Sequence, residues 1–214
     1  MTRKIFSVDA ETDGLYGDVW AIGAVWLDGG TAAHFEGQLD PAAVTDPWVH
    51  KNVVPAVNLC RYDNRTDLLN AFWDFWTAHK DSSDDCIADF GVPVEAGLFR
   101  ACVELDDIRT FEGPYPLDEV GTALRVAGFD RHADRRKLAG RPNLVEHNPV
   151  DDALVSALCW QKATTSRRFG QAIIRRWLTR RHCSHPRAFD RGWLIDTGMR
   201  KLFECQLCGR RKVV

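Results

Sequence analysis

Long apolar runs are absent from this sequence of 214 residues. No uninterrupted apolar stretch approaches the roughly 20 residues that a helix needs to cross a bilayer. The opening residues, MTRKIFSVDAET, carry charge but lack an apolar core of signal-peptide length. Internal repeats and low-complexity segments are missing as well. These absences argue against a membrane protein, and they predict a cytoplasmic protein without a membrane partner.

The cysteines cannot all pair with one another, because there are seven of them. Cys60, Cys86, Cys102 and Cys159 are scattered among apolar neighbours, so we expect them to be small core residues. The other three cysteines lie in the last 33 residues, together with two histidines. That clustering favours a metal site over disulfides.

Charge is distributed unevenly behind a net value of −2. Residues 167–214 hold 13 basic and 3 acidic side chains, which gives a net charge of +10. Residues 1–166 hold the other 15 basic and 27 acidic side chains, which gives a net charge of −12. The basic tail suits a polyanion and the acidic body suits cations. A tail that docks on the acidic body is the alternative interpretation.

Hydrophobic periodicity predicts an antiparallel meander over the first 40 residues, followed by alternating helices and strands. We expect a mixed α/β sheet flanked by helices in residues 1–166, a basic helix over 167–181 and a small module over 182–214. Trp73 and Trp76 are predicted core residues, and Thr66 or Asp67 is the expected cap of its helix. The predicted strands are 4–8, 19–27, 32–39, 86–90 and 107–110, the predicted helices 66–79, 94–104, 117–127 and 151–162, and the predicted loop 131–142.

Acidic residues recur at three points of the predicted domain. Asp9 and Glu11 share one face of the first strand, because side chains alternate along an extended chain, and like charges placed side by side call for a cation. The second point offers Asp89 and Glu95 around a strand-to-helix junction. The third is HNPVDDA, in which His147 precedes a helix that carries Asp151 and Asp152. Each of these acidic motifs is common when it occurs alone, but the three motifs together in this order are uncommon.

These motifs resemble those of the DEDD 3′–5′ exonucleases, the DnaQ-like group. The resemblance rests on DAETDGL at 9–15, AIGAV at 21–25 and HNPVDDA at 147–153, and it covers roughly residues 4–165. It implies a ribonuclease-H-like fold, and His147 with Asp152 matches the family's His-type third motif. The middle motif departs from the family's Asn-x-x-Phe-Asp, so we favour Glu95 as the third acid, with Asp89 as its neighbour or the alternative ligand.

The resemblance also implies a reaction. Two Mg²⁺ or Mn²⁺ ions would be held by Asp9, Glu11, Asp152 and Glu95 (or Asp89), and they would stabilise both oxygens of a phosphodiester displacement. His147 would act as general base, since an unperturbed imidazole has a pKa of about 6.5. Asp151 is expected to face solvent, with a fallback role as ligand. The substrate-binding residues implied next to these acids are Thr12, Gly14 and Leu15.

The C-terminal cysteines predict a structural zinc site. Cys205-Gln206-Leu207-Cys208-Gly209 has the form of a zinc knuckle, and Cys183-Ser184-His185 lies about 20 residues before it. Four protein ligands, Cys183, His185, Cys205 and Cys208, would close the zinc shell, with His182 as the alternative to His185. A zinc-ribbon-like module is therefore expected over residues 182–214.

The predicted basic helix holds six arginines, which include Arg175, Arg176 and Arg180, opposite an apolar side. Arginine pairs well with phosphate, so we expect this helix to bind nucleic acid largely without regard to its sequence. The expected function is thus a metal-dependent exonuclease that acts at the 3′ end of single-stranded or 3′-overhanging DNA or RNA. A nucleic-acid-binding or polymerase-tethering module with a degraded active site is the alternative, and the sequence does not reveal the oligomeric state.

Overall fold

The computed structural model describes residues 3–130, 132–166, 192–196, 201–205 and 211–213, the last three ranges by backbone alone. The chain divides into two compact units. One comprises Met1–Arg125 and Phe129–Ala163, and the other comprises Val126–Gly128 and Thr164–Val214.

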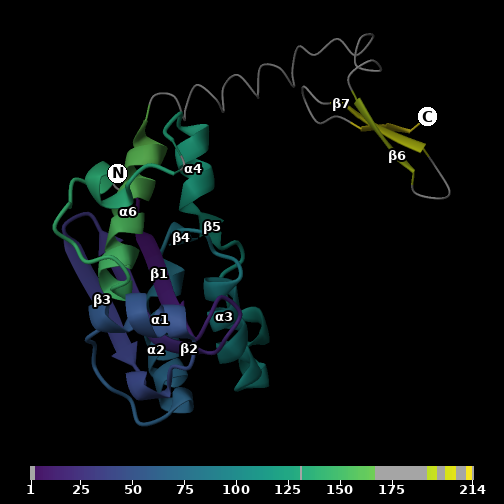
Figure 1. Ribbon diagram of the computed structural model, residues 1–214. Coiled ribbons are helices and arrows are strands. Elements are labelled where there is room, and N and C mark those ends of the chain that lie inside the picture. The colour runs from purple at the N-terminus through teal and green to yellow at the C-terminus, as the bar shows by residue number, and fades with distance from the viewer. Residues whose placement is uncertain (1–2, 131, 167–191, 197–200, 206–210, 214) are drawn as a thin grey trace. The chain divides into compact units, whose positions relative to one another are not determined.

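A mixed five-stranded sheet forms the centre of the first unit, with strand order β3-β2-β1-β4-β5 (Figure 1). β1, β2 and β3 form an antiparallel meander, whereas β4 runs parallel to β1 and β5 runs parallel to β4. The predicted meander and the predicted mixed α/β sheet flanked by helices are therefore confirmed. The strands are β1 (Ile5–Thr12), β2 (Val19–Asp28), β3 (Thr31–Gln38), β4 (Asp85–Ala88) and β5 (Asp118–Glu119).

Helices follow or connect these strands. The predicted helix over 94–104 has the bounds of α3, and the prediction over 66–79 differs from α2 by one residue at its start. The α-helices are α1 (Pro47–Asn52), α2 (Arg65–His79), α3 (Val94–Glu104), α4 (Val120–Val126), α5 (Arg135–Ala139) and α6 (Pro149–Thr165). Short 3₁₀ turns are η1 (Pro41–Ala43), η2 (Val54–Ala56), η3 (Lys80–Ser82) and η4 (Asp107–Phe111).

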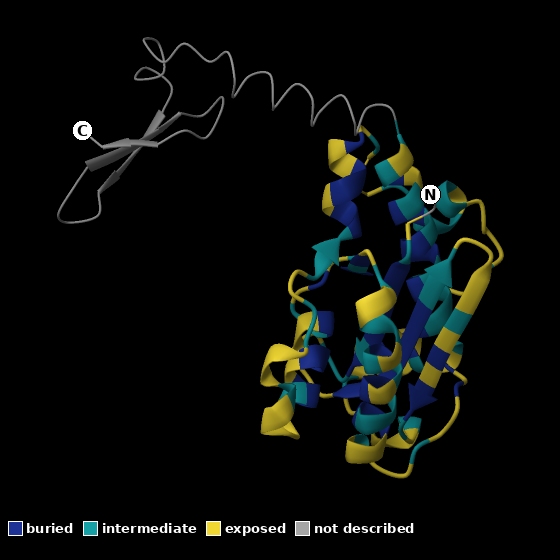
Figure 2. Cartoon of the chain, turned by 180° about the vertical axis from the view of Figure 1, so that it is seen from behind, coloured by how far each residue is buried: buried dark blue, intermediate teal, exposed yellow. Residues whose placement is uncertain are grey.

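One face of the sheet packs against α2 and α3. Phe6 and Val8 of β1 are fully buried there against the apolar sides of these two helices. Trp73 and Trp76 of α2 are buried in the same cluster, which confirms their prediction as core residues. Figure 2 shows buried residues concentrated in the strands and on the inward sides of the helices. Burial of such large apolar side chains contributes about 1.5–3 kcal/mol each.

The opposite face of the sheet meets α6 and the segment around α1. Trp160 of α6 donates a hydrogen bond from Nε1 to Asp85 of β4 at 2.9 Å, and Asp85 also pairs with Arg3. Gly23 of β2 lies so close to the start of α6 that a Cβ there would stand 2.2 Å from the carbonyl carbon of Pro149. The missing side chain of Gly23 therefore lets α6 begin against the sheet.

Three local predictions were wrong because a side-chain cap or a strand pairing outweighed the apolar pattern. The predicted strand over 107–110 is the 3₁₀ turn η4, which begins where Asp106 accepts a hydrogen bond from the N–H of Ile108. The predicted cap of α2 is instead Asn64, whose Oδ1 accepts from the N–H of Asp67 at 2.9 Å. The predicted helix over 117–127 begins only at Val120, because Asp118 and Glu119 pair with β4.

Two further predictions need correction. The predicted loop over 131–142 contains α5, which Asp134 caps at its start and which Gly140 ends with a left-handed φ of 70°. Cys60 is exposed rather than buried, because Leu59 beside it points inward and the extended chain turns the thiol outward. Cys102 and Cys159 are buried as predicted, and Cys86 is partly buried.

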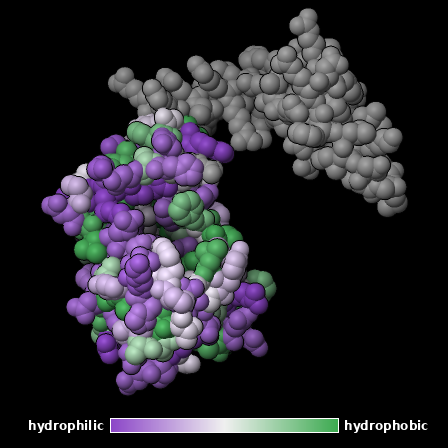
Figure 3. All heavy atoms as spheres, viewed as in Figure 1, coloured by the Kyte–Doolittle hydropathy of each residue, from purple (hydrophilic) through white to green (hydrophobic). Residues whose placement is uncertain are grey.

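The second unit contains a three-stranded antiparallel sheet in the order β6-β7-β8. Its strands are β6 (Gly192–Asp196), β7 (Lys201–Cys205) and β8 (Arg211–Val213). Within the part of the chain that the structure describes, no helix combines the length and the apolar character that a bilayer crossing requires. Figure 3 shows hydrophilic residues over much of the visible face of the first unit, with hydrophobic residues interspersed.

Candidate active site

β1 carries the first two carboxylates of the candidate site. Asp9 pairs with Gly23 and Glu11 with Ala21 of β2, so both acids lie on the sheet face that the start of α6 approaches. Pairing with β4 stops at Ser7, opposite Ile87. The backbone of β1 beyond Ser7 is therefore open on the β4 side, where α3 begins.

Glu95 fills this opening from the first turn of α3. Glu95 is only 6% exposed, and the backbone N–H groups of Ala10 and of Glu95 itself lower the pKa of its carboxyl group, against the effect of burial. Ala10 separates Asp9 from Glu11, so the Glu95 carboxylate lies beside the acidic pair. The short β4 and the early start of α3 together place the third carboxylate.

The start of α6 supplies the fourth carboxylate. Asn148 precedes the helix, and its Oδ1 accepts from the N–H of Val150 at 3.2 Å. Asp152 lies in the first turn, and its Oδ2 accepts from the N–H of His147 at 2.8 Å. The side chain of Asp151 instead accepts from the N–H of Val145, so it is engaged outside the acidic set.

His147 is held beside these acids in an uncommon backbone conformation. Among the described residues it is the only non-glycine residue with a positive φ, at 63°. Its Nδ1 lies 3.7 Å from Oε1 of Glu11, and its ring meets that of Trp48 edge to face, with centroids 5.8 Å apart. The bond from its N–H to Asp152 stabilises this left-handed turn and points the imidazole at Glu11.

Asp89 does not take the same position as Glu95. It follows β4, and its Oδ1 accepts from Nε of Arg135 at 2.9 Å. Arg136, next along α5, contacts Oδ1 of Asp152 through Nη1 at 3.3 Å. Both arginines come from the segment predicted as a loop, and the Asp134 cap before two basic residues was the signal for a helix there.

Burial and mutual repulsion raise three carboxyl pKa values in this cluster. The pKa of Asp9 lies well above its usual range, first because of burial and then because of the charges of Glu95 and Glu11. Burial raises the pKa of Glu95 to about 7, against its two backbone hydrogen bonds. Burial likewise raises the pKa of Asp152 to about 6, although the N–H of His147 opposes the shift. The neighbouring carboxylate of Glu11 raises the pKa of His147, although partial burial opposes the shift.

Such a cluster needs protons or a cation to be stable at neutral pH. In the described part of the chain, one group of three residues has ligand atoms that all lie within 4.8 Å of one another, and it consists of Glu11, His147 and Asp152. Carboxylate oxygens are the ligands that Mg²⁺ and Mn²⁺ prefer. The residues present therefore fit a hard divalent cation.

Asp9, Glu95 and Asp152 line a cleft of about 930 Å³ together with His147, whereas Glu11 is not among its lining residues. Its rim is apolar and exposed, and of the rim residues the sequence predicted only Leu15. Thr12 is buried, and Gly14 turns with a φ of 77° against Asp46, so neither lines the cleft, although both lead the chain to Leu15. The exposed rim residues are Leu15, Tyr16, Phe90 and Val92.

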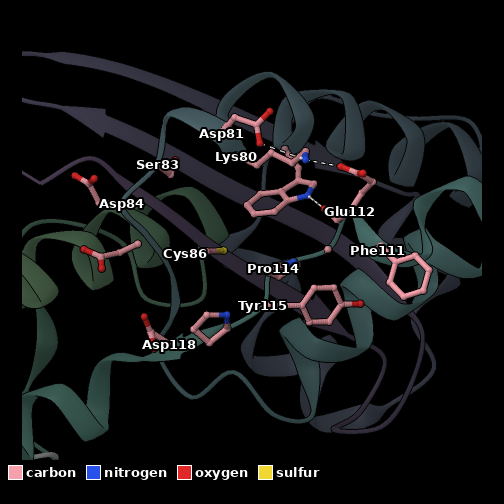
Figure 4. A pocket seen from close by; sticks show the side chains of 14 residues that line it. Lys80, Asp81, Ser83, Asp84, Cys86, Phe111, Glu112, Pro114, Tyr115 and Asp118 are labelled. Atoms are coloured by element: carbon pink, nitrogen blue, oxygen red, sulfur yellow. Dashed lines mark hydrogen bonds and ion pairs between the residues drawn. The ribbon is translucent and has the colours of Figure 1, made fainter.

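A second pocket, of about 270 Å³, has a different character (Figure 4). Lys80 reaches both Asp81 and Glu112 across its upper wall, and Asp85 pairs with Arg3. The backbone N–H of Lys4 donates to Asp84. Cations and backbone donors therefore already engage four of the five acids that line this pocket, Asp118 being the fifth.

No known protein-family model matches this chain, and a search of curated proteins finds no match. The chemistry of the site is therefore what indicates its function.

The remaining predicted site residues lie outside the described residues. They are Arg175, Arg176 and Arg180 of the basic segment, and the zinc ligands Cys183, His185 and Cys208 with the alternative His182. Cys205 ends β7, where it pairs with Gly192, and only its backbone is described. The zinc site and the phosphate-binding helix stay predictions.

We expect a divalent cation to stabilise the protein more at pH 8 than at pH 5. Carboxyls whose pKa is raised by folding favour the folded state fully below about pH 4, and that stability is lost as pH rises through about 6–7. A cation that replaces the protons restores it. At a hundredfold excess over Kd, Mn²⁺ should contribute about 2.7 kcal/mol and raise Tm by roughly 5–10 °C.

Thermal melts with and without Mn²⁺ at both pH values measure this difference. Asp9→Ala serves as the control and should melt at the same temperature with and without the ion. A Tm shift of equal size at pH 5 and pH 8 would count against the carboxylate cluster as the binding site.

Proposed function

We propose that this protein is a metal-dependent 3′–5′ exonuclease that hydrolyses phosphodiester bonds at the 3′ end of DNA or RNA. The observation that carries the proposal is the convergence of Asp9 and Glu11 from β1, Glu95 from α3 and Asp152 from α6, with His147 beside them. These acids are separated by up to 143 positions in the sequence, from 9 to 152, yet the charges of Glu11, Glu95 and Asp152 all act on Asp9.

The fold supports the same proposal. The strand order β3-β2-β1-β4-β5, with an antiparallel meander followed by two parallel strands, is compatible with a ribonuclease-H-like fold. In that fold we place the active site where β1 carries the first two acids. The resemblance of DAETDGL and HNPVDDA to the DEDD exonucleases gives the reaction class.

Four carboxylates are suited to two Mg²⁺ or Mn²⁺ ions, because their charges offset those of the cations. Asp9, Glu11, Glu95 and Asp152 would together hold these ions. When bound, the ions would supply stabilisation of the attacking and leaving oxygens. The low exposure of Glu95 keeps that ligand in place before substrate arrives.

His147 is suited to accept the proton of the attacking water. Its Nδ1 faces Glu11, which leaves Nε2 as the atom that takes the proton. Because Glu11 raises the pKa of His147, a cation that neutralises Glu11 would also bring the imidazole toward its neutral, basic form. Trp48 limits the rotation of the ring from the other side.

The apolar rim of the cleft suits the bases and sugar of a terminal nucleotide. Leu15, Tyr16 and Phe90 are each at least 60% exposed, so they are available for contact with a single strand. We assign the predicted arginines of residues 167–181 to contacts with nucleic-acid phosphates, and a structural zinc ion to the C-terminal module.

The test is an incubation of the full chain with end-labelled single strands of DNA and RNA, with Mn²⁺ or with EDTA. We expect stepwise shortening from the 3′ end only with Mn²⁺, and no shortening by Asp9→Ala. Asp74→Ala removes an exposed acid of α2 outside the cleft and should shorten the strands like the wild type. If the wild type binds the strands without shortening them, the degraded binding module is the better description.

A further inference from the structure

α5 presents two arginines to the cleft floor, and their surroundings differ. Arg135 is 13% exposed; its Nε donates to Asp89 at 2.9 Å and its Nη1 to the carbonyl of Ala133 at 3.3 Å. Arg136 is 19% exposed and bridges Glu146 and Asp152. Arg135 is thus tied to an acid outside the proposed ligand set, whereas Arg136 contacts a proposed ligand.

The two contacts of Arg136 are unequal. Nη2 lies 2.9 Å from Oε2 of Glu146, which is the length of a good charge-assisted hydrogen bond. Nη1 lies 3.3 Å from Oδ1 of Asp152, which is longer than such bonds prefer. Glu146 therefore anchors the guanidinium at the cleft, and the contact with Asp152 is the weaker one. A divalent cation would displace this weaker contact first.

We propose that Arg136 binds a phosphate group in the cleft. Its ion pair with Asp152 occupies the guanidinium until a divalent cation binds. The proposal rests on the proposed function, because it takes the cleft to bind a nucleotide phosphate beside the metal. Before the cation arrives, Arg136 offsets part of the charge of Asp152. When the Asp152 carboxylate binds the cation, Nη1 of Arg136 loses that partner. It can then donate a hydrogen bond to the phosphate that enters with the metal.

Two opposite effects on binding follow for Arg136→Gln. Without nucleotide, Mn²⁺ should bind about three- to tenfold more tightly than to the wild type, since a competing positive charge is gone. With saturating Mn²⁺, a nucleoside 5′-monophosphate should bind about tenfold more weakly, the loss expected for one charged hydrogen-bond donor to phosphate. Arg136→Lys keeps the charge but not the fork, so it should retain the wild-type affinity for Mn²⁺ and part of the nucleotide affinity.

Calorimetric titrations at pH 8 measure both affinities, with adenosine and deoxyadenosine 5′-monophosphates as nucleotide probes. Arg100→Gln is the matched control, because it removes an exposed arginine of α3 that pairs with Glu104 outside the cleft, and both affinities should stay at the wild-type values. Circular dichroism and Tm establish that each variant folds. These titrations need no turnover, so their outcome is separate from that of the strand-shortening assay.

If Arg136→Gln folds and binds Mn²⁺ with unchanged or lower affinity, Arg136 does not compete with the cation and the proposal fails. Unchanged nucleotide affinity would overturn the phosphate-binding half of the proposal. In either case Arg136 would be a structural tie between α5 and the start of α6.

Discussion

Glu95→Gln should lower the metal-dependent release of nucleotides by about 10²–10³-fold, the cost of removing one group that acts directly on the charges of the transition state. The reason is position: the Glu95 carboxylate is buried beside Asp9 and is fixed by the N–H of Ala10. Glutamine keeps the shape and the acceptor oxygen, so the variant removes the charge with little change in packing. Its affinity for Mn²⁺ should fall as well.

Asp89→Asn is the matched comparison, because it removes one negative charge from the lining of the same cleft. Asp89 is paired with Arg135 at 2.9 Å, and asparagine can still accept that hydrogen bond. The expected loss is about tenfold, the lower end of what outer-shell changes cost. Rates under saturating substrate and Mn²⁺ measure both variants. Equal losses for the two variants, or a larger loss for Asp89→Asn, would make Asp89 the third ligand.

Gly23→Ala should destabilise the protein and impair metal binding, although residue 23 is no ligand. An added Cβ would stand 2.2 Å from the carbonyl carbon of Pro149 and 2.3 Å from the nitrogen of Val150, both of them backbone atoms. The start of α6 must therefore move, and Asp152 moves with it. Overpacking of this kind costs about 3 kcal/mol, at the upper end of its usual range. Tm should drop by roughly 6–12 °C.

Gly97→Ala is the control for this substitution. Gly97 lies within α3, and a Cβ there would meet nothing within 4 Å. Alanine in a helix interior is favoured over glycine by about 0.5–1 kcal/mol, so this variant should melt slightly higher than the wild type. Calorimetry and Mn²⁺ titration of both variants measure the effects. If Gly23→Ala retains wild-type stability and Mn²⁺ affinity, β2 and α6 are not in the close contact described.

The sequence was sufficient to predict the features that follow from short-range rules. The alternation of β1 placed Asp9 and Glu11 on one face, and the bounds of α3 followed from Pro93 and an apolar pattern. The choice between Glu95 and Asp89 depends on where β4 stops pairing and on the position of Arg135, which is 40 positions from Glu95. Such tertiary contacts leave no local pattern.

The other failures have the same origin. α5 is five residues long, too short for hydrophobic periodicity, and its end groups Asp134 and Gly140 define it. Cys60 has apolar neighbours, yet the sequence does not reveal which of two alternating faces an isolated extended segment buries. The apolar rim residues Tyr16, Phe90 and Val92 lie in turns beside the acids, where exposure depends on loop conformation.

The spread of the ligands along the chain has a consequence for the order of folding. During synthesis Asp9 and Glu11 emerge early, Glu95 follows after most of the sheet has been made, and Asp152 comes last. Closing loops of this length is slow and is rewarded only when the later contacts form. The adjacent pair on β1 cannot complete the proposed cation site alone, so a nascent chain would bind the proposed ions only after α6 docks. Metal uptake would then be a late event of folding, and it would report that the last helix has reached the sheet.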